Sequence, residues 1–310
     1  MREIVINEND ASQRLDKFLT KFMPKLPSAM LYKSLRKNCV RVNGKHVKDG
    51  AYKLNAGDKL SLYFKDEFFS GEVQTVKKSD IKLDIVYEDE NILLINKPVG
   101  IVAHADDKGT KDTLVDAVKA YLYEKGKFDP SEEHSFSPAL CNRLDRNTQG
   151  IIIAAKNAAA TRAVNEKIRE RQIQKLYLCI ADGMFEKKSD TLSAHLTRHE
   201  KTVSVSDTAS DNSKVIKTKY TVLAENDNAS LVEVELMTGR THQIRAQLAA
   251  IGHPLSGDTK YGSKTAGDYK LCSYKLRFAF SPDGGVLDYL ATREFSISVS
   301  FAKKFASQKS

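Results

Sequence analysis

The sequence predicts an α+β protein in which a mixed, largely antiparallel sheet domain follows a small ααβ unit. Its 310 residues suffice for two domains of ordinary size. After residue 81, strand-like runs outnumber helical ones, and they lack the regular alternation with helices that a parallel βαβ sheet requires. The polar stretch 66–80 separates the N-terminal ααβ pattern from the strand-rich pattern. The expected domains are therefore 1–65 and 81–305, with 66–80 as a linker.

The first 65 residues contain two helical patterns followed by short strands. Pro24 ends the first helix, and a second helix is expected over 28–38 with Ser28 as its N-cap. Asn43-Gly44 between two β-rich runs is typical of a two-residue hairpin, and an alternating strand follows over 57–64. The apolar positions of the first helix recur at the spacing of one helix face: Leu15, Phe18, Leu19 and Phe22.

Positive charge is concentrated near the N-terminus. Residues 1–70 hold 14 Lys and Arg against 8 Asp and Glu, which is +6 of the net +9 of the chain. A basic module beside a nearly neutral body indicates a polyanionic partner, most often a nucleic acid. A solubilising surface would show the same charge balance, so charge alone leaves both interpretations open.

Residues 12–65 resemble the alpha-L RNA-binding domain of ribosomal proteins and RNA-modifying enzymes. The resemblance rests on RLDKFL, a basic second helix, VRVNGK and GDKL, in that order. It implies that the two helices lay a basic face along RNA phosphates, which provides affinity and strong salt dependence rather than sequence specificity. The candidate phosphate contacts are Arg14, Lys33, Arg36, Lys37 and Arg41.

Composition argues against several classes of protein. The opening segment MREIVINEND has no apolar core of the kind that a signal peptide needs, and no apolar run approaches the length of a membrane span. The 4 cysteines have no short spacing, which argues against a zinc site and a disulfide framework and fits a reducing cytosol. We therefore expect a cytoplasmic protein with no membrane association and no bound metal.

The region after residue 81 is expected to contain many strands and a few helices. The Ser-rich segment 199–214 is predicted to be an exposed excursion, and 302–310 a frayed tail. Hydrophobic periodicity predicts helices over 113–126, 156–171 and 241–252, and strands at both ends of 84–100 and over 151–156, 175–183, 219–225, 230–237, 270–280 and 293–301.

The segment 142–150, NRLDRNTQG, has an unusual arrangement of charge. Asp145 lies between Arg143 and Arg146, immediately before an apolar strand. Neighbouring arginines favour the ionised carboxylate, which could act as a nucleophile, as a base or as half of an ion pair. A surface salt bridge in a turn would explain the same residues, and the second RLD, at 14–16, is interpreted as structural.

A second candidate segment is 238–245, TGRTHQIR. Buried arginine requires a partner, and Asp145 is a plausible one for Arg240 or Arg245, while Thr241 could cap the following helix. His242 and the later His253 have no third residue at metal-ligand spacing, so a metal site is disfavoured. Tyr177, in the strand KLYLCIADG, would be a packed core residue on residue type alone.

Together, residues 81–300 resemble the RluA-type pseudouridine synthase family. YEDENILLINKPVGIVAH, RLDRNTQGIIIAAK, KLYLCIADG and TGRTHQIRAQLAAIGHPLSGDTKYG occur in the order of the family motifs. The resemblance implies the pseudouridine synthase fold. It implies catalytic roles for Asp145, Tyr177 and Arg245, with Arg245 pairing with Asp145, and it implies that Arg143 displaces the target base. Arg146, Arg240 and His242 are further candidates for substrate contact.

Two positions depart from the family pattern, and neither departure alters the carboxylate. Asn142 stands where many members have histidine, and Gln149 where a small residue is common. The implied reaction breaks the N1–C1′ bond of uridine and rejoins the base through C5, so it requires no cofactor and no metal. The target base must leave its stack to reach such a site.

The implied substrate is structured RNA, with large-subunit ribosomal RNA expected first and transfer RNA as a further possibility. Two other functions stay open at this point. One is a non-catalytic RNA-binding assembly factor with the same fold. The other is a glycosidase with two carboxylates, for which Asp258 is the second acid nearest to the motifs.

Overall fold

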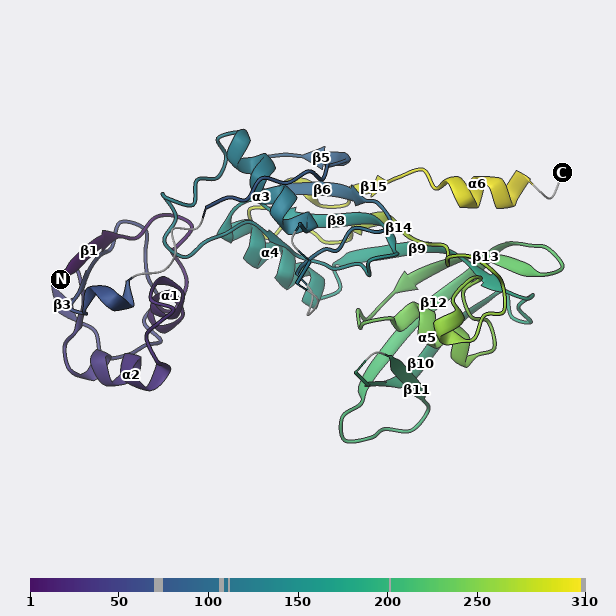
Figure 1. Cartoon of the computed structure of the whole chain (residues 1–310), viewed down its shortest axis with the longest axis horizontal. Coiled ribbons are helices and arrows are strands. Elements are labelled where there is room, and N and C mark those ends of the chain that lie inside the picture. The colour runs from purple at the N-terminus through teal and green to yellow at the C-terminus, as the bar shows by residue number, and fades with distance from the viewer. Residues whose placement is uncertain (70–74, 106–108, 111, 201, 308–310) are drawn as a thin grey trace. The chain divides into compact units, whose positions relative to one another are not determined.

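The computed structural model describes residues 1–69, 75–105, 109–110, 112–200 and 202–307. The chain forms two compact units (Figure 1). The first unit contains Met1–Asp80 together with Val115–Ala139 and Ala155–Arg162, and the second contains the remainder. The N-terminal region is therefore grouped with two segments from later in the chain.

A four-stranded antiparallel sheet with two helices forms the centre of the first unit. The strand order is β1–β4–β2–β3, with β1 at Arg2–Val5, β2 at Val40–Val42, β3 at Lys45–His46 and β4 at Lys59–Leu62. The helices are α1 (Leu15–Phe22) and α2 (Ser28–Arg36). Asn43 and Gly44 have φ values of 50° and 77°, as the predicted hairpin requires. Pro27, rather than the predicted Ser28, occupies the N-cap of α2.

The core of this unit consists of the apolar faces of its helices and sheet. The predicted face of α1 is confirmed, since Leu15, Phe18 and Leu19 are fully buried. After β4, a 3-10 turn at Asp66–Phe68 brings Phe68 and Phe69 onto the same core. The packed part of the unit therefore reaches into the segment that the sequence predicts as a linker.

Later segments of the chain bond to the N-terminal residues within this unit. Asn9 donates a hydrogen bond to Glu133 over 2.6 Å and accepts one from the backbone of Ala158 over 3.1 Å. Ser135 donates to Asp10 over 2.5 Å. Because these partners lie 124 or more residues apart, no local pattern predicts the contacts.

A large mixed sheet dominates the second unit, which confirms the predicted α+β class. Its strand order is β11–β10–β12–β13–β9–β14–β8–β6–β5, with β15 paired to β14 and β7 paired to β8. The pair β14–β8 is parallel, whereas the run from β11 to β14 is antiparallel. The strand bounds are Ile85–Glu88 (β5), Ile92–Lys97 (β6), Ala139–Leu140 (β7), Gln149–Ala155 (β8), Ile173–Asp182 (β9), Ser189–Arg198 (β10), Val203–Ser206 (β11), Lys214–Glu225 (β12), Ala229–Leu236 (β13), Leu271–Phe278 (β14) and Glu294–Ser296 (β15).

The remaining helices follow the predicted periodicity. They are α3 (Leu114–Glu124), α4 (Ala158–Arg169), α5 (Gln243–Ala250) and α6 (Ser300–Ser307), and the first three agree with the helices expected from the sequence. Among the helices of the described chain, none has both the length and the apolar character that a bilayer crossing needs.

The structure corrects three sequence expectations in this unit. The predicted excursion 199–214 contains strand β11, which pairs with the unpredicted, largely polar strand β10. The predicted strand 293–301 is ordered as β15 over only 294–296. The predicted frayed tail contains most of α6, because Phe301 and Phe305 are one turn apart and Phe301 packs against a cluster around Leu178.

Gly150, at the start of β8, is required by a close approach of two backbones. It has φ of +126°, and a Cβ atom at this position would lie 2.3 Å from the carbonyl oxygen of Ser273 on β14. The strands pair in parallel at this point, directly after the loop that carries Asp145. A side chain at position 150 would therefore push β8 away from β14.

We expect Gly150→Ala to lower the free energy of unfolding by about 1–3 kcal/mol, because it adds overpacking to backbone strain. Urea unfolding monitored by circular dichroism measures the effect. Gly252→Ala is the matched control, since Gly252 has φ of +89° but no atom within 4 Å of the added methyl group. Equal losses in the two variants would show that φ alone, and not the contact with Ser273, explains the requirement.

Candidate active site

The second unit contains an open pocket of about 1030 Å³ that is lined by Asp145, Tyr177 and Arg245. Asp145 lies in the loop between β7 and β8, Tyr177 lies within β9, and Arg245 lies in the first turn of α5. The three side chains for which the family resemblance implies catalytic roles therefore line one pocket, although they come from three separate elements.

Arg245 is buried and has two carboxylate partners. Its Nε and Nη2 donate to Asp258 over 2.6 and 2.8 Å, while its Nη1 lies 3.6 Å from Asp145 Oδ2. The guanidinium also lies over the rings of Tyr269 and Tyr261, at 4.4 and 5.0 Å from their centroids. Burial lowers the pKa of Arg245, but the hydrogen bonds to Asp258 and the charges of Tyr269, Asp258 and Asp145 together outweigh it, so the pKa lies above its ordinary value.

The predicted pairing of Arg245 with Asp145 is present as an ion pair of 3.6 Å, and Arg245 has a closer second partner in Asp258. From the sequence, Asp258 is a possible second acid of a glycosidase. In the structure Asp258 is 2% exposed and forms the bidentate pair with Arg245, whereas Asp145 lies beyond hydrogen-bonding distance of the same guanidinium. Asp258 thus stabilises the arginine, and this disfavours the two-carboxylate glycosidase.

His242 is a second cationic candidate beside Asp145. Its Nε2 lies 3.7 Å from Asp145 Oδ2, and its Nδ1 lies 2.7 Å from the hydroxyl of Tyr261. Burial lowers the pKa of His242, which favours the neutral ring at physiological pH. The residue has φ of +54° and stands at the N-cap of α5, where the sequence analysis placed Thr241.

Tyr177 contributes a buried, neutral phenol to the pocket. It is 5% exposed, and burial raises its pKa to about 12. The nearby charge of Asp145 acts in the same direction. At neutral pH the side chain therefore presents an aromatic ring and a protonated hydroxyl to whatever enters the pocket.

The loop that carries Asp258 is anchored to the end of β9. Asp182 accepts hydrogen bonds from Ser263 over 2.6 Å and from Thr265 over 2.9 Å. Gly257 has φ of +89°, and a Cβ there would lie 2.7 Å from the carbonyl oxygen of Gly267. The backbone beside Asp258 is thus closely packed, which fixes the carboxylate that holds Arg245.

Lys97 is a buried residue of this unit that the sequence analysis did not single out. Its ammonium group donates to the carbonyls of Pro98, Ile101 and Arg146 over 2.9–3.0 Å. It joins the segment after β6 to the residue after Asp145. Burial lowers its pKa to about 8. The sequence does contain a sign of this buried role, because Lys97 directly ends the apolar run ILLINK.

Asn142 has a structural role in the same loop. Its Oδ1 accepts from the backbone N–H of Ile153 over 2.8 Å, and its Nδ2 donates to the carbonyl of Ile151 over 3.4 Å. These bonds hold the loop before Asp145 against β8. Asn142, which departs from the family pattern, is therefore held in place by hydrogen bonds to the backbone.

The other predicted RNA contacts fall into separate groups. Arg143 and Arg240 line the pocket and are exposed, while Arg146 lies outside its lining and donates to Thr110 over 3.4 Å. In the first unit, Arg14 forms an ion pair of 2.6 Å with Asp16. The remaining four candidates of that unit lie on or just after α2 and on β2: Lys33, Arg36, Lys37 and Arg41.

Family models identify the class of protein that this fold and pocket define. A model described as RNA pseudouridylate synthase matches residues 91–250, and a model of the S4 domain matches residues 13–60. The chain belongs to the RNA pseudouridylate synthase family. It is accordingly an RNA pseudouridine synthase, an isomerase, with an N-terminal S4 RNA-binding domain, as the sequence analysis expects.

Similar proteins in bacteria support this assignment over most of the chain. The ribosomal large subunit pseudouridine synthase C of Vibrio parahaemolyticus is 32% identical over 264 residues, covering 84% of this chain and 79% of that protein. An uncharacterized RNA pseudouridine synthase of Mycoplasma capricolum is 31% identical over 294 residues, covering 90% and 92%.

A solved structure shares the fold. Human RNA pseudouridylate synthase domain containing 4 matches with a TM-score of 0.57 at 20% identity, over 73% of this chain and 92% of that one. At this identity the similarity concerns the fold, and it agrees with the mixed sheet described above.

The buried ammonium of Lys97 should make stability depend on pH. Its pKa is about 8 in the folded protein against 10.5 ordinarily, so between these values the unfolded chain binds one more proton. Stability rises with pH wherever the unfolded state binds more protons. The wild type should therefore gain stability relative to Lys97→Met as pH rises through this window.

Urea unfolding of both proteins at about pH 7 and about pH 10 measures this difference. Titrations common to both chains cancel in the comparison. A difference that stayed constant or fell with pH would show that Lys97 is not held as a buried cation.

Proposed function

We propose that this protein isomerises specific uridines to pseudouridine in large-subunit ribosomal RNA, with Asp145 as the catalytic carboxylate. The observation that carries the proposal is the pocket in which Asp145 lies 3.6 Å from an arginine that is itself bonded to a second carboxylate. The ribosomal substrate is supported by the similarity to the Vibrio enzyme, and transfer RNA is the second substrate to test.

Asp145 is suited to the chemistry because it is accessible and lies next to a cation. Its side chain is 24% exposed, and its Oδ2 lies 3.6 Å from Nη1 of Arg245. A carboxylate in this position can attack C1′ of the sugar or remove a proton from the sugar. In both routes the N1–C1′ bond breaks and the uracil turns within the pocket. In the first route C5 then displaces the carboxylate from C1′, and in the second the carboxyl group returns the proton to the sugar as C5 bonds to C1′. The C5 proton then leaves to water, and N1 takes up a proton.

Tyr177 is proposed to pack against the uracil during this turn. Its raised pKa of about 12 keeps the phenol protonated at neutral pH, so the ring supports the base and the hydroxyl serves as a donor. This assignment gives Tyr177 a positioning contact with the detached base, in preference to a role as the acceptor of the C5 proton.

Arg143 is proposed to occupy the space that the flipped uridine leaves in the RNA. It is exposed, it lines the pocket, and it lies two residues before Asp145. A flipped base costs a few kcal/mol of stacking and pairing, and a planar guanidinium can replace part of the lost stacking. Selection of the target is expected to depend on RNA shape and unpaired loops.

Mapping of pseudouridines in total RNA from cells with and without the protein tests the function directly. Loss of one or more sites in large-subunit ribosomal RNA supports the proposal, and loss only in transfer RNA identifies the other substrate. Unchanged maps together with retained ribosome association would instead support an assembly factor without catalytic activity.

Asp145→Asn should reduce the single-turnover rate by more than about a hundredfold, because the amide has neither the charge nor the basicity of the carboxylate. RNA affinity should be retained, since the side chain keeps its size. Activity within tenfold of the wild type would remove Asp145 from the catalytic role.

Arg245→Met should lower the rate by at least about a hundredfold, because it leaves the buried Asp258 and Asp145 without their cation. The free energy of unfolding should also fall by about 3–5 kcal/mol, the usual effect of breaking a buried pair. Rates must therefore be measured well below the melting temperature. Arg240→Met is the control, and if it proved the more severe variant, the assignment of Arg245 would be wrong.

Replacement of Lys33, Arg36 and Lys37 by alanine should weaken RNA binding and lower the slope of log Kd against log salt by about 2–3, as expected for three lost phosphate contacts. Filter binding over a salt series measures the slope. Lys303→Ala with Lys304→Ala, on exposed positions of α6, is the control, and an equal change in both proteins would contradict the role of α2.

A further inference from the structure

Lys175 lies on the wall of the pocket beside Tyr177. The two residues are separated by one position on β9, so their side chains leave the same face of the strand, and both line the pocket. A methyl group on Gly239 would lie 3.8 Å from Lys175 Nζ, which places the ammonium against the turn before α5. Lys175 therefore joins the pocket wall to the segment that carries Arg245.

Among the residues that the structure describes, no carboxylate pairs with the ammonium group of Lys175. Within the described part of the chain it forms no hydrogen bond or ion pair, and burial alone lowers its pKa. Lys175 is half-buried, and a partly desolvated cation without a partner has an unfavourable free energy that an anion entering the pocket would offset.

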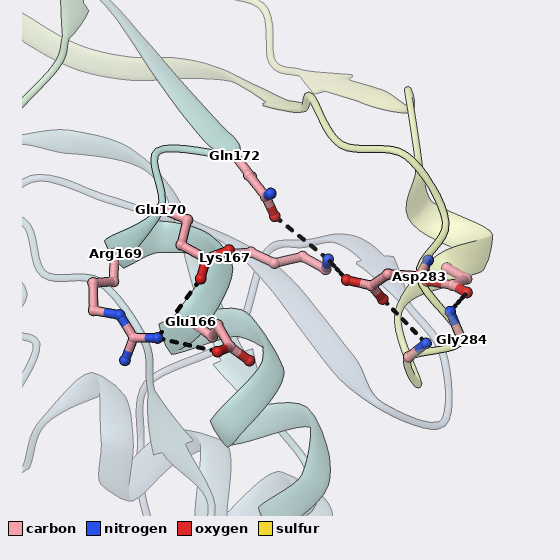
Figure 2. A network of polar contacts seen from close by, with 9 residues as sticks. Glu166, Lys167, Arg169, Glu170, Gln172, Asp283 and Gly284 are labelled. Carbon is pink, nitrogen blue, oxygen red and sulfur yellow. Dashed lines mark hydrogen bonds and ion pairs between the residues drawn. The ribbon is translucent and has the colours of Figure 1, made fainter.

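Three buried cations of the same unit are compensated by the protein. Lys97 has three carbonyl partners, and Arg245 has Asp258. Figure 2 shows Lys167 reaching from α4 to Asp283 and Gln172, at 3.1 and 3.5 Å, and its ammonium also lies 3.9 Å from the ring centroid of Phe280. These three cations have protein partners, whereas Lys175 is available to bind a partner that enters the pocket.

The enzyme class and the cations of the pocket favour an RNA phosphate as that partner. The substrate of the enzyme class is RNA, and a lysine ammonium binds phosphate as a compact point charge. Two residues along a strand span about 6.6 Å, so Lys175 lies close to the base that Tyr177 is proposed to contact. The same pocket is lined by further cations that would follow the RNA backbone: Arg143, Arg169, Arg171, Arg198, Lys214 and Arg240.

We propose that Lys175 binds the phosphate that flanks the target uridine and holds the RNA backbone in place while the detached uracil turns. This inference rests on the proposed function, because it assumes that a uridine occupies the pocket beside Asp145 and Tyr177. The reaction requires the sugar to stay at Asp145 after the base is released. A fixed phosphate on the same nucleotide provides that constraint.

The first test compares the stability and the RNA affinity of Lys175→Met. RNA affinity is measured in an Asp145→Asn background, with an in vitro transcript of large-subunit ribosomal RNA as the probe. Affinity should fall roughly tenfold or more, and the salt slope should fall by about 1. The melting temperature should stay equal or rise, because an unpaired, partly buried charge is removed. A fall in melting temperature, or unchanged affinity, would overturn the proposal.

Two further variants give matched controls. Lys175→Arg keeps the charge and should recover part of the affinity that Lys175→Met loses. Lys219→Met removes an exposed lysine of β12 that is not in the pocket lining, and it should leave affinity and salt slope nearly unchanged. Equal losses for Lys219→Met and Lys175→Met would mean that general surface charge accounts for the effect.

The second test identifies the phosphate. Once sequencing has located the modified uridine, a short RNA containing it is prepared with a neutral methylphosphonate at the flanking position. Wild-type protein should bind this RNA more weakly than the unmodified RNA. Lys175→Met already binds the unmodified RNA weakly, and the methylphosphonate should lower its affinity almost no further. Independent, additive losses would overturn the assignment. A wild type that forms no pseudouridine in ribosomal RNA would instead refute the proposed substrate, so the two failures are distinguishable.

Discussion

The position of Arg245 between two carboxylates is the interaction on which the active-site geometry depends. Asp258 takes the Nε edge of the guanidinium in a bidentate pair, and this leaves Nη1 directed at Asp145 from 3.6 Å. Because Asp258 is almost fully buried, the arginine has a fixed orientation before any RNA binds. Asp145 therefore lies next to a cation without forming a close hydrogen bond to it.

The surrounding backbone keeps both carboxylates in place through contacts that tolerate little change. Gly150 allows β8 to approach β14 immediately after the Asp145 loop, and Gly257 allows the Asp258 loop to pack against Gly267. Lys97 ties the residue after Asp145 to the segment that follows β6. A reaction in which the base detaches and returns benefits from such preorganisation, since the groups around it do not need to rearrange at each step.

Positive charge has different roles in different parts of the molecule. The S4 domain carries exposed lysines and arginines on and after α2, where water already solvates them and RNA phosphates can replace counterions. In the second unit, buried cations such as Lys97 and Arg245 are neutralised by protein groups and organise the fold. Lys175 is half-buried on the pocket wall and has no such group among the described residues, and this contrast is the physical basis for assigning it to the substrate.

The sequence by itself determined the α+β class, the helices α1 to α5, the hairpin at Asn43-Gly44 and the family motifs, because these depend on residues that are close together in the chain. Tertiary structure decided that Asp258 is the closer partner of Arg245, that three carbonyls accept hydrogen bonds from Lys97, and that no anion of the described residues pairs with Lys175. It also decided that β10, β11 and α6 are ordered, since their polar or short sequences form elements only against neighbours such as β12 and Leu178. Burial and pairing are properties of surfaces brought together from distant segments, and hydrophobic periodicity carries no information about them.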